Sequence, residues 1–305
     1  MAFIRKNKKI KESFGDRVLE AFVTIVLVLV LIIIGYPLIY VVSCSFSSSN
    51  ALSASRVLLW PVDLSVAGYK FVFQYKQVWI GYRNTIFYTI TNTLLTMLFQ
   101  ILMAYPLSKR DYQGKGLVLK LMLVAMMTSS GMIPTFILKM NLGMVGNISA
   151  IVLSGLVGIR NVFMLRNSFM HNIPGELFDA AKIDGANDFQ CLWQLGIPLA
   201  KATISVLVLY AAVGAWNDYF NALIYLAGKQ ELWPLQLFLR NIMASAQGLT
   251  ADDIGGGAAY ETYQDSGIEQ IRYCLIVITT VPVLAMYAIV QKYFQKGVMV
   301  GSVKG

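Results

Sequence analysis

Long apolar runs separated by polar stretches dominate the pattern along the chain. A helix that crosses a bilayer needs about 20 mostly apolar residues, because in hydrocarbon each backbone polar group must be hydrogen-bonded within its own segment. Six runs come close to this length. They predict transmembrane helices at residues 18–42, 84–107, 116–138, 148–165, 203–226 and 270–293. The pattern therefore predicts an all-α integral membrane protein with six transmembrane helices.

The basic residues predict the orientation of these helices. Six crossings place both termini on one side, and the N-terminal tail, the loop after the second helix and the C-terminal segment are all rich in lysine and arginine. Such segments favour the cytoplasmic face, so both termini are expected to be cytoplasmic. The expected divisions are a basic tail (1–17), a first helix (18–43), an extracytoplasmic loop (44–83), a core domain (84–294) and a cytoplasmic tail (295–305). Within the core lie a cytoplasmic loop (171–199) and an acidic extracytoplasmic loop (227–269).

Composition removes several function classes. Charged residues make up 13% of the chain and hydrophobic residues 57%, whereas a soluble domain is about a quarter charged. This excludes a disordered chain, a coiled coil and an ordinary cytosolic enzyme. The net charge of +9 comes from the basic residues of the segments expected to be cytoplasmic, so nucleic acid is not an expected partner. One histidine and three cysteines without paired spacing predict no metal site.

Catalytic signatures are missing as well. The sequence has no GxxxxGK[ST] loop, no HExxH and no GxSxG. Asp218 is the only acidic residue deep in a predicted span, so a carboxylate pair or a proton relay is not expected. We therefore expect a non-enzymatic protein that binds no cofactor and whose energy, if it transports a solute, comes from another subunit.

The largest predicted cytoplasmic loop carries the most specific pattern. Pro174 suits the start of a helix over residues 176–183, and Gly185 ends it. Asn187 or Asp188 then caps a second short helix over residues 189–196. The expected structure is two short helices joined by a tight glycine turn beneath the bilayer.

The same segment resembles a known family. Asp179-Ala180-Ala181 is followed after three residues by Gly185 and after nine more by Leu195-x-Ile197-Pro198, a spacing similar to the EAA loop of ATP-binding cassette (ABC) importer permeases. DAAKIDGA and YAAVGAWNDYFNALIYL resemble the maltose-permease type. The loop after the first helix and the ending KGVMVGSVKG resemble the LplC/YtcP-like oligosaccharide permeases. Asp179, Leu195 and Ile197 depart conservatively from the family's glutamate, isoleucine and leucine.

The resemblance implies a type I ABC importer permease fold in a bacterial cell membrane. It implies partners: a second homologous permease, two ATPase subunits that carry ATP and Mg, an extracytoplasmic solute-binding protein and an oligosaccharide substrate. The coupling loop would dock into the ATPase and transmit its movement by alternating access. The residues that it assigns to this contact are Glu176, Asp179, Ala180, Ala181, Asp184, Gly185, Ala186, Leu195 and Pro198.

Polar residues in the fifth predicted span are candidates for the substrate pathway: Trp216, Asn217, Asp218, Tyr219, Asn221 and Tyr225. Asn217, Asn221 and Tyr225 are spaced by four and would share one face of a continuous helix, offering amides and an aromatic ring to a sugar. The alternative is that these groups hydrogen-bond between helices. Arg160 is a further candidate, either for an acidic sugar or as a structural partner of Asp218.

Two other classes of function stay open at this point. A stand-alone secondary sugar transporter would need an ion site, for which only Asp218 is available. A membrane enzyme acting on lipid-linked sugar would need a carboxylate pair or a metal cluster. Neither explains the EAA spacing, and the sequence does not identify the sugar.

Overall fold

The computed structural model describes residues 14–109, 111–128, 130–244 and 257–301. Throughout these residues the chain is helical or irregular, and its one β-type pairing is an isolated antiparallel bridge between Ser47 and Leu64. The predicted all-α class is therefore confirmed. The helices are α1 (Phe14–Ser45), α2 (Ser49–Ser53), α3 (Ala67–Gln74), α4 (Lys76–Ser108), α5 (Lys115–Met127), α6 (Met132–Asn141), α7 (Ser149–Val152), α8 (Ile159–Asn172), α9 (Gly175–Ile183), α10 (Asp188–Cys191), the π-helical turn η1 (Leu192–Gly196), α11 (Ile197–Leu199), α12 (Lys201–Trp216), α13 (Phe220–Tyr225), the 3-10 turn η2 (Gln230–Leu232), α14 (Leu235–Ala244) and α16 (Gly257–Gly301).

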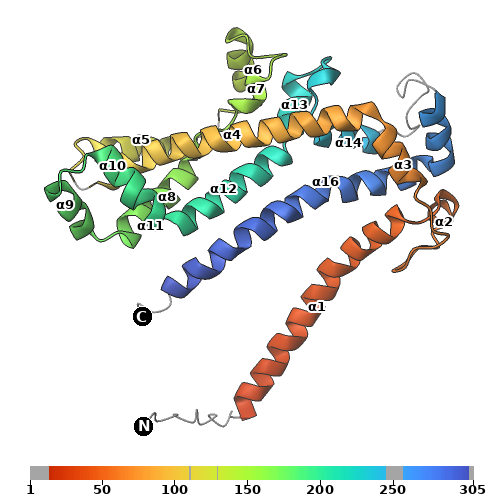
Figure 1. Cartoon of the computed structure of the whole chain (residues 1–305), viewed down its shortest axis with the longest axis horizontal. Helices are drawn as coiled ribbons and strands as arrows, with labels where there is room; N and C mark the ends of the chain where they lie inside the picture. Colours follow the sequence, from red (N-terminus) through yellow and green to blue (C-terminus); the bar gives the residue numbers. More distant parts are fainter. Residues whose placement is uncertain (1–13, 110, 129, 245–256, 302–305) are drawn as a thin grey trace.

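Helix α4 is the axis of the molecule. It packs against α12 and α8 over much of its length and against α14 near its start, while α16 lies along α12 (Figure 1). The largest apolar cluster fills the space between α4, α8, α12 and the short helices α9–α11, and includes Tyr105, Leu165, Phe169, Leu192 and Leu207. Close packing of these large side chains holds that end of the bundle together, because within a membrane helices associate mainly through van der Waals contact and hydrogen bonds.

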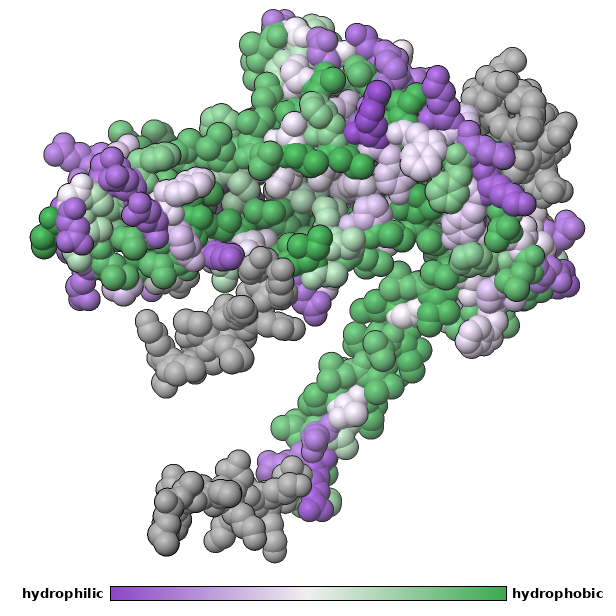
Figure 2. Space-filling view, viewed as in Figure 1, coloured by the Kyte–Doolittle hydropathy of each residue, from purple (hydrophilic) through white to green (hydrophobic). Residues whose placement is uncertain are grey.

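Helix α1 stands apart from the bundle. Its 32 residues span about 48 Å at 1.5 Å per residue, enough to cross a bilayer. It contacts α16 near its C-terminal end, where Ser43, Cys44 and Ser45 are buried. All its valine, leucine and isoleucine side chains except the half-buried Val41 are exposed, and Figure 2 shows a nearly continuous hydrophobic surface along the helix. Such a surface is suited to lipid, because in water it would be a large unpaired apolar patch.

Three of the six predicted spans appear as single apolar helices of sufficient length: α1, α4 and residues 267–291 of α16. Helix α4 starts eight residues before the predicted 84. The count rises to five if each of two bent helix pairs is one span, so six spans are not confirmed in the described residues.

The third predicted span is one of these bent pairs. Helices α5 and α6 meet at 114°. Gly131, with φ of +70°, precedes α6, and Pro134 lies in its first turn. Proline is tolerated there because the first helical amide groups have no intrahelical partner. The chain therefore changes direction between α5 and α6 instead of continuing as one straight helix over 116–138.

The fourth and fifth predictions are wrong as continuous helices. Residues 148–165 form the short α7, an irregular stretch and the first half of α8. The fifth span breaks after Trp216, and α13 begins at Phe220. Helix α12 instead meets the α10–α11 segment at 82°.

The long polar loops contain structure of their own. Residues 44–83 hold α2, α3 and the start of α4, and residues 227–244 hold η2 and α14. The buried Gln270 joins α16 to the first of these loops, since its amide donates to the carbonyls of Ser45 and Ser65 and accepts from the Gly68 amide. Most of the two predicted tails, residues 1–13 and 302–305, lies outside the described residues.

Candidate functional site

The predicted coupling segment forms two short helices joined by a glycine turn. Helix α9 begins after Pro174, with Glu176 in its first turn and Lys182 in its last, as the helix dipole favours. Gly185 has φ of +83°. Its amide donates to the Lys182 carbonyl at 3.0 Å, and the next amide, of Ala186, donates to Ala181 at 2.9 Å. This Schellman termination needs a left-handed residue, which is why glycine ends α9.

The second short helix, α10, also has a well-defined end, an N-terminal capping box at Asn187. Asn187 accepts from the Gln190 amide at 2.8 Å, and the Gln190 side chain accepts from the Asn187 amide at 2.9 Å. This reciprocal capping box confirms Asn187, not Asp188, as the cap. The predicted helix 189–196 is only partly regular, because α10 ends at Cys191 and a π-helical turn follows. Cys191 and Leu192 are buried, which fixes the turn against the bundle.

Lys109 links the two short helices to the end of α4. Its Nζ lies 3.9 Å from the ring centre of Phe178 on α9 and 4.6 Å from that of Tyr105 on α4. It also forms an ion pair with Asp188 on α10, at 3.7 Å. Burial lowers the pKa of Lys109, and the charge of Asp188 opposes this effect. The cation therefore bridges α4, α9 and α10. From the sequence, this lysine counted only among the basic residues that predict the orientation of the helices.

Opposite this buried side, the coupling segment presents apolar side chains to the exterior. Ile183 is 86% exposed, and Leu177, Phe189 and Trp193 are exposed as well. We call these four residues the apolar coupling face. Of the predicted coupling residues, the exposed ones are Glu176, Asp179, Ala180, Asp184, Gly185 and Pro198, and the half-buried ones are Ala181, Ala186 and Leu195. The segment is thus anchored on one side and open on the other.

A cavity of about 280 Å³ lies between α4, the α7–α8 segment and the junction of α12 with α13. One wall is a row of polar residues on α4, spaced by four and therefore on one helical face: Tyr88, Asn92, Thr96 and Gln100. Asn161 lies on α8, and Asp218 and Asn221 flank the start of α13. The period-four polar row is visible in the sequence, and the sequence analysis missed it.

Gln100 differs from the other three members of the row. Tyr88 donates to the Leu232 carbonyl, Asn92 donates to two carbonyls of the α7–α8 segment, and Thr96 donates to Asn92. Gln100 is 1% exposed, and neither its amide nitrogen nor its amide oxygen has a hydrogen-bond partner among the described residues. An unpaired buried amide is costly, so this side chain is suited to a polar ligand inside the cavity.

Gly158 leaves room for this amide. A Cβ at that position would lie 3.2 Å from the Asn161 amide nitrogen and 3.4 Å from that of Gln100. The two amide groups therefore flank one glycine at the cavity wall. Alanine at Gly158 would crowd the Asn161 amide and touch that of Gln100.

The predicted pathway residues divide into two groups. Asp218 and Asn221 line the cavity, and the Asp218 carboxylate accepts from the Asn221 side chain at 2.7 Å and from its backbone amide at 3.1 Å. Arg160 is exposed and forms no ion pair with Asp218 in the described part of the chain. Of the two roles considered for Arg160, the structural pairing with Asp218 is not formed in these residues.

The other pathway candidates lie outside the cavity. Trp216 is buried and donates to the Thr279 carbonyl at 3.1 Å, which joins α12 to α16. Tyr225 is buried beneath Lys139, whose Nζ is 3.9 Å from its ring centre. Asn217 hydrogen-bonds Gln236 and Val213, and Tyr219 lies in the break between α12 and α13. The helix break separates residues that a continuous helix would place on one face.

Apolar helices without a nucleotide-binding loop, an anchored segment with an exposed apolar face, and a polar cavity within the bundle define a membrane transport subunit. No family model matches the chain. The chain is 35% identical to Protein LplC of Bacillus subtilis over 88% of its own length and 89% of that protein. It is 34% identical, over 88% and 92%, to YtcP of the same organism, a permease protein of a polygalacturonan/rhamnogalacturonan transport system.

A solved structure agrees with these sequence matches. A chain of a bacterial ABC transporter involved in the import of the acidic polysaccharide alginate superposes with a TM-score of 0.84. The identity is 32%, and the match covers 94% of this chain and all of that one. The protein therefore belongs to the permease subunits of ABC oligosaccharide importers. It is a non-catalytic membrane subunit, and the reading as a stand-alone secondary transporter is rejected.

Proposed function

We propose that this chain forms one half of an importer's translocation pathway, with a second permease of similar fold as the other half. Two ATPase subunits carry the ATP and Mg, and one of them binds the coupling segment of this chain. A solute-binding protein delivers an oligosaccharide from the opposite side. In this arrangement both termini and residues 171–199 are cytoplasmic, and residues 44–83 and 227–269 face outward in a bacterial cell membrane. The basic and acidic loops of the sequence support this orientation.

The apolar coupling face carries the proposal. Four large apolar side chains on a well-capped segment are left exposed by the described residues, whose core packs against other side chains of the same segment. Such a patch is typical of a protein contact. Because α9 and α10 are fixed to α4 through Lys109 and to the main core through Phe178 and Leu192, a push on this face moves the bundle as a unit. This rigidity is what transmission of ATPase closure requires.

The polar cavity supports a direct contact between this half and the sugar. Gln100 and Asn161 offer amide groups, and Asp218 offers a carboxylate, to sugar hydroxyl groups. The unpaired Gln100 amide supports this role, because a hydroxyl-rich ligand would supply both a donor and an acceptor. YtcP belongs to a polygalacturonan/rhamnogalacturonan transport system and the solved structure to an importer of alginate, so the similarity supports a saccharide as substrate without selecting one.

The test is co-purification of the tagged chain, expressed with its genomic neighbours, in mild detergent. Recovery of a second permease and an ATPase supports the proposed assembly. Ile183→Glu is expected to lose the ATPase and keep the second permease, because it places a charge at the most exposed position of the apolar coupling face. Lys229→Glu, an exposed change just beyond α13, is the matched control and retains both. If Ile183→Glu keeps a full complement of ATPase, α9 is not the contact.

A further inference from the structure

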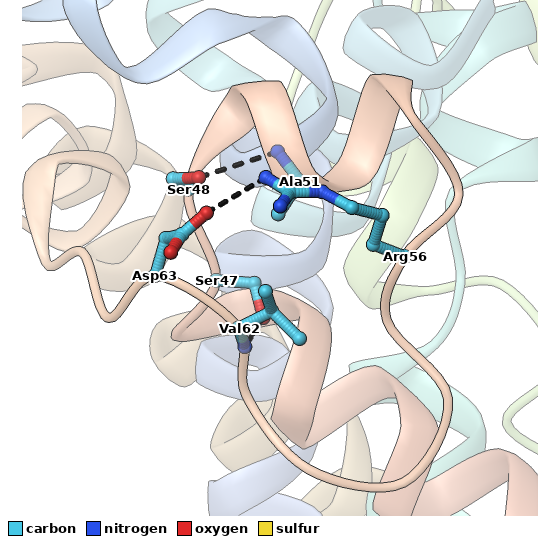
Figure 3. Close-up of polar contacts among 6 residues, drawn as sticks. All are labelled: Ser47, Ser48, Ala51, Arg56, Val62 and Asp63. Atoms are coloured by element: carbon cyan, nitrogen blue, oxygen red, sulfur yellow. Dashed lines mark hydrogen bonds and ion pairs between the residues drawn. The ribbon is translucent and has the colours of Figure 1, made fainter.

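Residues 56–64 form a loop that folds back onto the C-terminal end of α1. The Ser43 hydroxyl on α1 donates to the Leu59 carbonyl at 2.5 Å. Just past α1, the Ser47 hydroxyl accepts from the Val62 amide at 3.1 Å, as Figure 3 shows. The loop therefore lies beside the last turn of α1 rather than projecting away from it.

The base of the loop is closed by charge and by backbone geometry. Arg56 and Asp63 form an ion pair at 2.8 Å, drawn in Figure 3. Ser55 and Asp63, at the two ends, have positive φ values of 53° and 51°. Two non-glycine residues in the left-handed region hold a conformation that costs free energy, so the shape of the loop is fixed by its surroundings.

The loop sends apolar side chains in two directions. Val57 points inward, into a small core with Cys44 of α1 and Leu52 of α2. Leu58 and Trp60 point outward and are 68% and 81% exposed. Leu64, in the antiparallel bridge with Ser47, is 79% exposed. We call these three outward residues the Trp60 patch.

The position of the patch along α1 identifies what covers it. The apolar run of α1 reaches Val42, whose side chain is exposed, and polar residues follow from Ser43. The edge of the hydrocarbon therefore falls close to Ser43, whose side chain binds the loop. Leu58 and Trp60 flank Leu59, whose carbonyl accepts this hydrogen bond, so the Trp60 patch lies next to the point where the apolar run of α1 ends. Tryptophan is enriched at this boundary because one end of its ring system is apolar and the other donates a hydrogen bond.

We propose that the Trp60 patch is a membrane-interface anchor that inserts among lipid headgroups and upper acyl chains, and so fixes the depth of the α1 end. The Arg56–Asp63 pair at its base stays at the water side. This assignment rests on the membrane location of the family and not on the partners proposed above. It removes the loop 56–64 from the surface offered to a solute-binding protein.

The experiment measures the environment of Trp60 in the full chain, with its co-purified partners, in lipid nanodiscs. The sequence has five tryptophans, so the difference in emission between the native chain and Trp60→Phe isolates the signal of Trp60. The nanodiscs contain phosphatidylcholine brominated either near the headgroup or near the chain centre, and acrylamide is the aqueous quencher. Trp193→Phe, which removes an exposed tryptophan of the apolar coupling face, is the control and should show no response to bromine.

The expected result is strong quenching of Trp60 by the shallow bromine, weaker quenching by the deep bromine, and protection from acrylamide. Quenching by acrylamide alone would place the patch in water, where a solute-binding protein has access, and would overturn the proposal. Protection from both quenchers would place a protein subunit over the patch and would overturn it equally. Trp60→Phe keeps an apolar ring, so loss of folding is not expected to obscure the result.

Discussion

The role of Gly185 can be tested by separating backbone strain from intermolecular contact. Gly185 and Gly228 have φ values of +83° and +79°, and among the described residues, sequence neighbours aside, a Cβ at either position would find no atom within 4 Å. Within the chain, alanine at either site costs backbone strain alone, about 1–2 kcal/mol for a left-handed residue. Part of this is offset by the lower entropy of the unfolded chain. Gly185→Ala and Gly228→Ala are therefore expected to lower stability equally and mildly.

Transport should distinguish the two sites. If the ATPase packs on Gly185, any side chain there intrudes into the contact. A loss of about 1.4 kcal/mol of binding free energy would then weaken the affinity for the ATPase about tenfold. Asparagine adds the decisive comparison, since it adopts the left-handed region more readily than alanine but is larger. Contact predicts that uptake falls from glycine to alanine to asparagine and is abolished by Gly185→Asp, while all variants remain in the membrane.

The assay is ATP-driven uptake in proteoliposomes at matched protein levels, together with thermal unfolding and ATPase co-purification. Gly228→Ala should retain uptake. Better uptake with Gly185→Asn than with Gly185→Ala would mean that strain, not contact, makes glycine necessary. Equal loss of uptake in Gly185→Ala and Gly228→Ala would refute the reasoning in a second way.

Three further predictions follow from the site. Gln100→Leu should lower uptake without lowering the thermal midpoint, because it removes an unpaired buried amide. Lys109→Met should raise the thermal midpoint at neutral pH, because burial lowers the pKa of Lys109 and its charged form therefore destabilises the folded state. This destabilisation is present below the pKa of Lys109 in the folded protein and is lost as the pH rises from there toward its pKa in the unfolded chain. The difference between variant and native protein should therefore shrink at alkaline pH. Trp216→Phe should cost about 1 kcal/mol of stability, because it removes a buried hydrogen bond to the Thr279 carbonyl, with substrate affinity unchanged.

Each of these has a contrary outcome. Normal uptake by Gln100→Leu would mean that the Gln100 amide does not contact the substrate. A large loss of stability in this variant would mean that the amide has a structural partner. A lower midpoint for Lys109→Met at every pH would mean that the ion pair and ring contacts outweigh the burial cost. Weaker substrate binding by Trp216→Phe at unchanged stability would return Trp216 to the sugar contacts.

Several features of the structure follow from local sequence alone. The glycine turn at Gly185 and the cap at Asn187 depend on backbone conformation and on hydrogen bonds between residues three to five apart, which a short sequence window contains. The strongly apolar helix α1 was predicted for a related reason, since a run of this length has few alternatives to crossing a membrane.

The predictions of continuous fourth and fifth spans failed for a common physical reason. Periodicity assumes that a helix continues through a polar stretch, but at Trp216 the backbone breaks and Asp218 organises the start of α13 through Asn221. The same assumption merged α7 with α8. The sequence contains the polar groups, yet their direction depends on breaks whose energy is balanced by partners distant in the chain.

By itself, the sequence determined that this is a membrane protein without its own nucleotide-binding loop, and that residues 171–199 carry an EAA-like turn. Only the tertiary structure decided that Lys109 joins α9 to α10, that Gln100 is left unpaired beside Asn161, and that Trp60 lies next to the end of α1. Apolar runs and caps are local properties, because each is satisfied within a few residues. Cavities and anchors are not, because they arise where segments far apart in the chain leave a polar group unpaired or an apolar group exposed.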